Sequence, residues 1–563
     1  MSYALHQHRA PVQSAPDDFI NLKSYRFPGR SNVITVYRDY AGGLPFDIAD
    51  YEMLFQDPAT RELIRSARTI GCFYIESPGM RSLIKRLGVD TFELLVAASS
   101  IIRPGVAESG MMQEFILRHQ DPGRRKYLVP EMEKILGETY GVMIYQEDVI
   151  KVVHHIAGMG LDEADLLRRA MSGKMRSPSA MLKLEQRYYE SCASRGLNRT
   201  VAEELWRQIK SFAGYAFCKS HSASFALLSY QVAYLKAHYP AEFMASVLSN
   251  SGGYYTPAVY VQEAKRMGVK VLLPCVNASE YEYTGSDGVI RIGLMAVKNL
   301  SVQTARCITD ERSVNGYFLS LLDFLRRTHT GYETTKLLIT CGAMDSLGET
   351  RRTLLRLLDV YIHHRRVMDD PAGDLFAHET LQLEREVRTP FDFTIEEKCL
   401  AEHEIFDYMV TLHPLEFFPL VINDRSVVQA KDLVNMHNRR VKMAGWFMAS
   451  KRIKTSKGDI MKFLSLEDLT GTFEAVLFPK VYERYAVKTL SMGPYVIEGR
   501  VDSLMGNNII VDKLEVLPAM HIKAAQQWDS AEKQYTDNEK ITEEEVNLVG
   551  KLGAEKLLYA YAG

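Results

Sequence analysis

The sequence predicts a multidomain protein that is mainly α-helical and carries a C-terminal β-barrel. Its 563 residues suffice for roughly three to five domains, and 46% apolar with 25% charged residues is typical of globular proteins. Residues 57–283 show a dense helical pattern with few breaks. Residues 441–517 instead alternate apolar and polar side chains, as strands with one buried face do.

Composition excludes several other classes of protein. No apolar run reaches the length of a membrane span, and residues 1–19 lack the apolar core of a secretion signal, so we expect a cytoplasmic protein without membrane contact. The seven cysteines are odd in number and form no C-x-x-C pair, which argues against a disulfide framework or a zinc ribbon. With a net charge of −2, any nucleic-acid binding must come from local clusters of Lys and Arg.

The segment DEADLLRRAMSGK predicts a helix with Asp162 as its N-cap and Gly173 as its stop. Arg168 and Arg169 then leave the polar face together. Two guanidiniums side by side suit bidentate contacts with phosphate oxygens. The alternative is a solvated face on which Asp165 is their partner.

A second cationic cluster stands at the start of a long helix that ends before Pro240. Lys219, Ser220, His221 and Ser222 occupy its predicted first turn. A helix N-terminus offers unpaired N–H groups and a positive dipole end, so an anion is stabilised there. Ordinary capping by serine is the alternative.

The alternating region predicts five strands with a helix between the third and the fourth, the order of an OB-fold. We expect its first hairpin loop to carry Lys451, Arg452, Lys454 and Lys457 beside aromatic side chains at 446 and 463. Positive charge next to aromatic rings suits single-stranded nucleic acid, although solvated lysines are the alternative.

Five motifs, in order, resemble the alpha subunit of bacterial replicative DNA polymerase III, a family C polymerase. They are GCFYIESPGM, SSIIRPG, ETYGVMIYQEDVI, DLLRRAMSGK and FAGYAFCKSHSASFALLSYQ. The resemblance runs from about Asp57 to about Leu517. It implies the following order of domains: a weakly specified segment or palm-edge remnant (1–56), helical fingers (57–285), tandem helix-hairpin-helix motifs (286–350), a helical linker (351–440), an OB-fold (441–518) and a tail (519–563).

The resemblance also implies which residues bind ligands. The incoming nucleotide would be lined by Arg168, Arg169, Lys219, Ser220 and His221, with Tyr145, Gln146 and Glu147 shaping the pocket and Arg103 as a further phosphate contact. In the first hairpin, Lys298 and Asn299 are the expected DNA contacts, because such hairpins aim backbone N–H groups at phosphates. Family members also carry a short peptide for the sliding clamp. Here Asp374, Leu375 and Phe376 would serve, although Ala372 replaces the usual Gln.

The palm chemistry of the family has no counterpart in this sequence. Nucleotidyl transfer needs two Mg²⁺ ions held by Asp carboxylates. Asp47 and Asp50 are too far apart for one strand face, and Asp392 lies in the wrong region, so we expect structural roles for them. The N-terminal phosphoesterase-type domain has no counterpart either. A shifted reading frame, or a split enzyme with a separate palm-bearing polypeptide, would each explain this.

The sequence therefore predicts a segment of the polymerase III alpha subunit that binds dNTP and primer–template DNA in template-directed replication. Its expected partners are the sliding clamp and other holoenzyme subunits, and Mg²⁺ is the cofactor of the parent enzyme, a DNA-directed DNA polymerase. The isolated chain is expected to be inactive. The alternative function is that of a non-catalytic accessory protein that binds DNA and the clamp.

Overall fold

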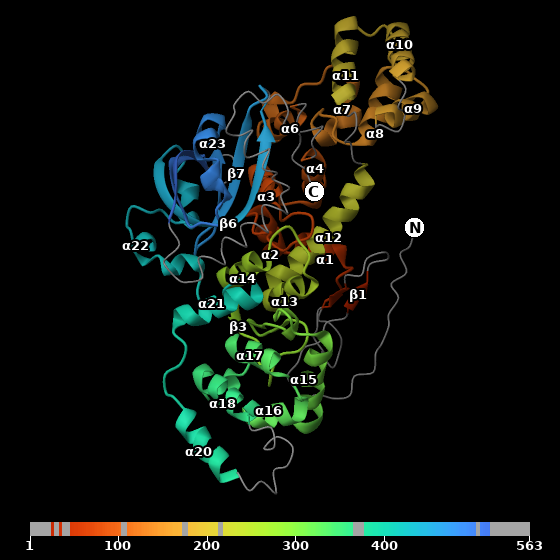
Figure 1. The fold of residues 1–563 in the computed structure, drawn as a ribbon. Coiled ribbons are helices and arrows are strands. Elements are labelled where there is room, and N and C mark those ends of the chain that lie inside the picture. The colour runs from red at the N-terminus through yellow and green to blue at the C-terminus, as the bar shows by residue number, and fades with distance from the viewer. Residues whose placement is uncertain are drawn as a thin grey trace.

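The computed structural model describes residues 46–102, 110–171, 178–211, 218–363, 377–455, 457–502 and 507–517, together with two short strands, β1 (Ser24–Arg26) and β2 (Val33–Thr35). Figure 1 shows a helical body at the centre, a helical extension above it, a barrel packed on one side and further helices below. Arg103, Asp374, Leu375 and Phe376 lie outside the described residues. The structure therefore does not test their predicted roles.

The helical body is built around a buried helix, α4 (Phe92–Ile101), whose residues Leu94–Ile101 are all buried. A helix that is apolar on every side must be surrounded by other elements. Here α12 (Lys219–His238) packs across it. The surrounding helices are α1 (Tyr51–Gln56), α2 (Pro58–Arg65), α3 (Pro78–Leu87), α13 (Pro240–Asn250) and α14 (Pro257–Arg266).

The helical extension contains the predicted arginine helix. Its members are α6 (Met111–Gln120), α7 (Glu131–Leu136), α8 (Gln146–Lys151), α9 (Leu161–Met171), α10 (Pro178–Ser194) and α11 (Arg199–Ser211). Helix α9 begins at Leu161, so the prediction of Asp162 as the N-cap was wrong. The Glu163 carboxylate instead accepts a hydrogen bond from the Gly160 N–H at 3.0 Å and satisfies the helix end.

A small three-stranded sheet follows the body, and the sequence did not predict it. Its order is β3 (Lys270–Leu272), β5 (Val289–Arg291), β4 (Thr284–Ser286), with β3 and β5 parallel. Strands of three residues are too short to show alternation. The helices below the sheet are α15 (Val302–Asn315), α16 (Leu321–Thr328), α17 (Tyr332–Thr340), α18 (Arg351–His363), α20 (Ala377–Val387) and α21 (Ile395–Phe406).

A short helix, α22 (Pro419–Ile422), leads to the barrel. The barrel has five strands with a helix between the third and the fourth, so this prediction is confirmed. The elements are β6 (Arg440–Lys454), β7 (Ile460–Glu467), β8 (Thr472–Leu477), α23 (Pro479–Tyr485), β9 (Tyr495–Asp502) and β10 (Asn508–Val516). A parallel pairing between β8 and β10 closes the barrel. Alternate side chains such as Leu464, Leu466 and Ala475 fill its interior.

The outer face of β7 and β8 packs against the helical body. A β-bulge at Met448 of β6 directs this side chain into the core of the body. The Arg266 guanidinium of α14 pairs with the Glu467 carboxylate of β7 at 2.7 Å, and both side chains are almost fully buried. The barrel is therefore joined to the body by packing and by a buried ion pair.

No helix in the part of the chain that the structure describes is both long and apolar enough to span a membrane.

Candidate nucleotide- and nucleic-acid-binding sites

The two predicted cationic clusters meet at the turn that begins α8. The Arg168 Nη1 donates a hydrogen bond to the Gln146 side-chain oxygen at 3.0 Å. The Lys219 backbone N–H donates to the Glu147 carboxylate, also at 3.0 Å. Gln146 and Glu147 are adjacent in the chain, so the start of α8 links the arginine helix α9 to the N-terminus of α12.

Asp165 holds the two arginines side by side. Its carboxylate accepts from the Arg168 Nε at 2.8 Å and pairs with the Arg169 Nε at 2.7 Å. The hydrogen bond from Arg168 and the charges of both guanidiniums lower the pKa of Asp165. The pairing that the sequence offered as an alternative is therefore present in the structure. It also fixes the two guanidiniums as neighbours, since one carboxylate cancels part of their repulsion.

The N-terminus of α12 is occupied by acidic side chains. Lys219 is the first residue of the helix, as predicted, and its N-cap is Cys218, which makes no side-chain capping bond. The alternative of ordinary serine capping is thus wrong, and the buried Ser222 hydroxyl pairs instead with that of Ser100 at 2.7 Å. The Glu147 carboxylate takes the place of an anion at the helix end, and the Lys219 ammonium forms an ion pair with Glu138.

Asp148 positions this turn, and the sequence interpretation missed it. Its buried carboxylate accepts hydrogen bonds from the Ile144 and Tyr145 backbone N–H groups, each at 3.0 Å. Burial raises the pKa of Asp148 to about 6. Only the reach-back half of a capping box is present, because the N-cap Tyr145 makes no side-chain capping bond. A Tyr followed three residues later by Asp is not the sequence signature of a capping box, so the sequence contained no signal for this role. The Tyr145 ring is buried, and its centroid lies 5.5 Å from the Lys219 ammonium.

Ser220 and His221 follow on the first turn of α12, and both are exposed. The Ser220 hydroxyl lies 3.2 Å from the Cys218 sulfur. The predicted places of Ser220 and His221 beside a nucleotide remain predictions.

The predicted DNA contacts of the first hairpin lie in the turn before α15. Asn299 adopts a left-handed backbone conformation with φ of 62°. The Lys298 ammonium pairs with the Asp407 carboxylate at 2.5 Å, next to the end of α21. Lys298 therefore fastens the turn to α21, and its role at a phosphate remains a prediction.

The basic residues of the barrel lie mostly on a strand. Lys451, Arg452 and Lys454 belong to β6, so the prediction that they sit in the hairpin loop was wrong for these three. The antiparallel pairing of β6 with β7 continues through Ile453 and extends the strand to Lys454, which stands opposite Ile460. Lys457 is in the turn, and Lys451 stands opposite Phe463 of β7. Lys451 and the half-buried Phe463 are thus cross-strand neighbours, whereas the other predicted aromatic residue, Trp446, stands opposite Glu467. Their role at a nucleic-acid strand remains a prediction.

The acidic residues considered for the palm have structural contacts, as expected. Asp50 caps α1 by accepting from the Met53 N–H at 3.0 Å, and Asp47 accepts from the Ala49 N–H at 2.9 Å. Asp392 accepts from the Arg351 N–H at 2.9 Å and pairs with Lys398 at 2.6 Å. Among the described residues, no group of three His, Cys, Asp or Glu side chains is arranged to hold a metal ion.

The sequence of the chain is similar to those of known polymerase subunits. Residues 36–196 match the model of the bacterial DNA polymerase III alpha subunit finger domain, and residues 268–354 match a helix-hairpin-helix motif. The chain is 33% identical over 499 residues to the DNA polymerase III subunit alpha of Treponema pallidum (strain Nichols), which covers 86% of this chain and 42% of the relative. It is 31% identical over 513 residues to that of Staphylococcus aureus (strain Mu50 / ATCC 700699), covering 89% of this chain and 46% of the relative.

The chain thus spans somewhat less than half the length of the curated relatives it matches. The finger-domain match, the helix-hairpin-helix match and these relatives show that the chain contains finger and helix-hairpin-helix regions similar to those of bacterial DNA polymerase III alpha subunits.

Proposed function

We propose that this chain binds the triphosphate of an incoming dNTP and the primer–template DNA during replication, as a region of a polymerase III alpha subunit. One observation carries the proposal. The Arg168 guanidinium and the Lys219 backbone N–H donate hydrogen bonds to the side chains of two adjacent residues, Gln146 and Glu147 respectively. Fixed guanidinium and ammonium groups beside a helix N-terminus form a strong site for phosphate oxygens.

Carboxylates hold these cations in place before a ligand binds. Asp165 pairs with both arginines, Glu147 accepts from the N-terminus of α12, and Glu138 pairs with the Lys219 ammonium. A triphosphate carries more negative charge than any one of these carboxylates, so it would displace them in turn. The cations are then already oriented when the nucleotide arrives, which lowers the cost of ordering them.

The experiment that tests the proposal is a nucleotide titration of the full chain and its variants. Arg168→Ala and Lys219→Ala are each expected to weaken dNTP binding about ten-fold or more, since a charge-assisted hydrogen bond is lost. Primer–template binding should change little. Arg207→Ala is the matched control, because Arg207 also pairs with a carboxylate three residues earlier, Glu204, on the neighbouring helix α11.

Each outcome of this titration decides between two functions. Loss of dNTP affinity in both variants, with the control unchanged, supports nucleotide binding by the fingers. Unchanged dNTP affinity in both variants would refute it. DNA and clamp binding that persist in that case would favour the accessory protein that the sequence offered as the alternative.

A further inference from the structure

A cavity of about 620 Å³ lies where the barrel meets the helical body, away from the turn at Gln146. Helices α2, α3, α12 and α14 line it on one side, and the barrel residues around Thr472 and Asn507 line it on the other. Its volume is that of a pocket for a small ligand. The charged residues of its lining are six cations, Arg68, Arg81, Lys85, Lys236, Arg266 and Lys431, and three acids, Glu62, Glu263 and Glu474.

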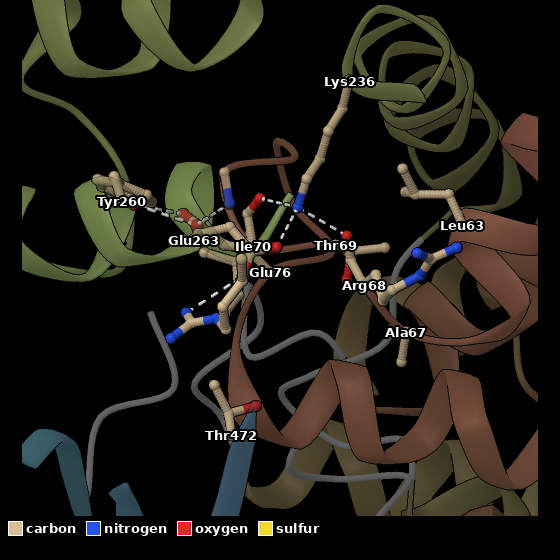
Figure 2. A network of polar contacts seen from close by, with 12 residues as sticks. Leu63, Ala67, Arg68, Thr69, Ile70, Glu76, Lys236, Tyr260, Glu263 and Thr472 are labelled. Carbon is tan, nitrogen blue, oxygen red and sulfur yellow. Dashed lines mark hydrogen bonds and ion pairs between the residues drawn. The ribbon is translucent and has the colours of Figure 1, made fainter. Parts of the chain in front are cut away.

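Two of the six cations are neutralised by buried partners. The Lys236 ammonium donates to the Glu263 carboxylate and to the Arg68 and Ile70 carbonyl oxygens, each at 2.7 Å, as Figure 2 shows. The Arg266 guanidinium pairs with Glu263 at 3.2 Å and with Glu467 at 2.7 Å. Lys236 and Arg266 line the cavity, but their positive charges are largely balanced by these carboxylates, so we expect them to attract an anionic ligand only weakly.

Arg81 and Lys85 lie one turn apart on α3 and reach toward the barrel. The Arg81 Nη2 donates to the Thr472 hydroxyl at 2.6 Å, and the Lys85 ammonium donates to the Asn507 side-chain oxygen at 2.7 Å. Arg81 also donates from Nε to the Ala67 carbonyl oxygen at 3.1 Å and from Nη1 to the Tyr255 hydroxyl at 3.5 Å. All of these acceptors are neutral. Burial, and then the charge of Arg81, lower the pKa of Lys85, which shows two cations sharing one partly buried space. Among the described residues neither group forms an ion pair with a carboxylate, although the charge of Arg81 contributes to the lowered pKa of Glu263.

The remaining acids of the lining do little to balance this charge. Glu62 is already paired with Arg65, at 2.5 Å. Burial raises the pKa of Glu474 to about 7, despite a favourable contribution from Arg81, so a large part of this carboxyl is neutral at physiological pH. An anion between Arg81 and Lys85 would relieve their repulsion.

We propose that this junction cavity binds a phosphorylated small molecule of nucleotide size, whose phosphate oxygens contact Arg81 and Lys85. The exposed Lys431 and Arg68 add positive charge to the lining. Thr470 and Asn507 of the barrel supply hydroxyl and amide groups for the uncharged part of the ligand. Because the body and the barrel each contribute lining residues, a bound ligand would hold the two together. This site is separate from the proposed dNTP site on α9 and α12.

The test is a calorimetric titration of the full chain with inorganic pyrophosphate and with ADP, in a Lys219→Ala background that weakens the other proposed site. Adding Lys85→Gln is expected to weaken pyrophosphate binding about ten-fold or more, and Lys431→Gln to weaken it less. Lys85→Arg keeps the charge and should keep the affinity. Arg86→Gln is the matched control, since Arg86 lies on the same helix but donates to Gln113 outside the cavity.

Pyrophosphate and ADP affinities that are equal with and without Lys85→Gln would overturn the proposal. So would a loss confined to oligo-dT binding, because the cations would then serve a nucleic-acid strand. The result is independent of the proposed dNTP site, since Lys219 is already replaced in every variant compared.

Discussion

The Lys236–Glu263 ion pair allows a quantitative test of what holds the helical body together. The Lys236 side chain is 1% exposed and that of Glu263 is 10% exposed. The Lys236 ammonium makes three hydrogen bonds of 2.7 Å, two of them to backbone carbonyls of the loop between α2 and α3. Lys236→Met keeps an unbranched side chain, shorter by the one nitrogen atom, and removes the charge and all three bonds.

The expected loss of unfolding free energy follows from the partners left behind. Removing one member of a buried ion pair costs roughly 3–5 kcal/mol, because the other charge stays buried without compensation. Arg266 remains 3.2 Å from Glu263, so we expect the lower end, about 3 kcal/mol. For a cooperative unit of about 150–250 residues this corresponds to a decrease in Tm of roughly 6–12 °C.

The effect should depend on pH in a defined direction. Although burial alone would raise it, Lys236 and Arg266 hold the pKa of Glu263 down at about 2, below its ordinary value of 4.5. A lowered carboxyl pKa contributes stability above about pH 4.5 that is lost as the pH falls toward 2. The difference between the wild type and Lys236→Met should therefore shrink over that interval.

The assay is thermal and urea unfolding followed by circular dichroism. Lys183→Met is the matched control, because Lys183 is an exposed lysine on helix α10. The double variant Lys236→Met, Glu263→Gln should lose less than the sum of the single losses, since neither charge is left alone. A Lys236→Met protein within about 1 kcal/mol of the wild type would refute the reasoning, as that value is far below the cost of an uncompensated buried charge.

Three further predictions concern the barrel and the chemistry. Burial raises the pKa of Glu474 to about 7, so the contribution of this carboxyl to stability is present below pH 4.5 and is lost as the pH rises through 7. Glu474→Gln should therefore flatten the decline in Tm between about pH 5 and 8. Parallel curves of Tm against pH for the wild type and the variant would contradict this prediction. Lys451→Ala should weaken binding of oligo-dT and reduce the salt dependence of its affinity by about 0.7 in the log–log slope, because one phosphate contact is lost; an unchanged slope would place Lys451 outside the interface. Purified chain with Mg²⁺ is predicted to extend a primer negligibly, because the sequence shows no counterpart of the Asp carboxylates of the family's palm; robust extension would refute this prediction.

The barrel could be predicted from the sequence because its signal is local. Each strand alternates between a packed interior and an outer face, so the five ranges appear as period-two patterns and match the observed strands closely. The sheet of β3, β4 and β5 gave no such signal, since three residues hardly complete one period.

The candidate nucleotide site could be predicted only in part. The helix that begins at Lys219 was correct because Pro240 and the apolar run mark its limits. The contacts that join Arg168 to Gln146 and Lys219 to Glu147 connect residues 22 and 72 positions apart. No periodicity carries information over such separations, so the expectation that these residues share one site came from the family resemblance, and the individual contacts came from the fold.

The docking of the barrel could not be predicted either. Glu467 ends a strand that appears half-exposed from its alternation, and Arg266 ends a helix whose last turn appears solvated. The buried charge of Glu467 is explained by Arg266, which pairs with Glu263 as well. Charged residues near the ends of helices and strands usually face water, so nothing in the sequence indicated that either residue is buried at an interface.

Arg266 pairs with one carboxylate on its own helix, that of Glu263, and with a second carboxylate on the barrel, that of Glu467. If the two parts were produced as separate polypeptides, the helical body would retain a partner for this guanidinium, whereas Glu467 would have to depend on water. A barrel transplanted onto a foreign scaffold would accordingly dock well only where the host supplies a basic side chain at the equivalent place.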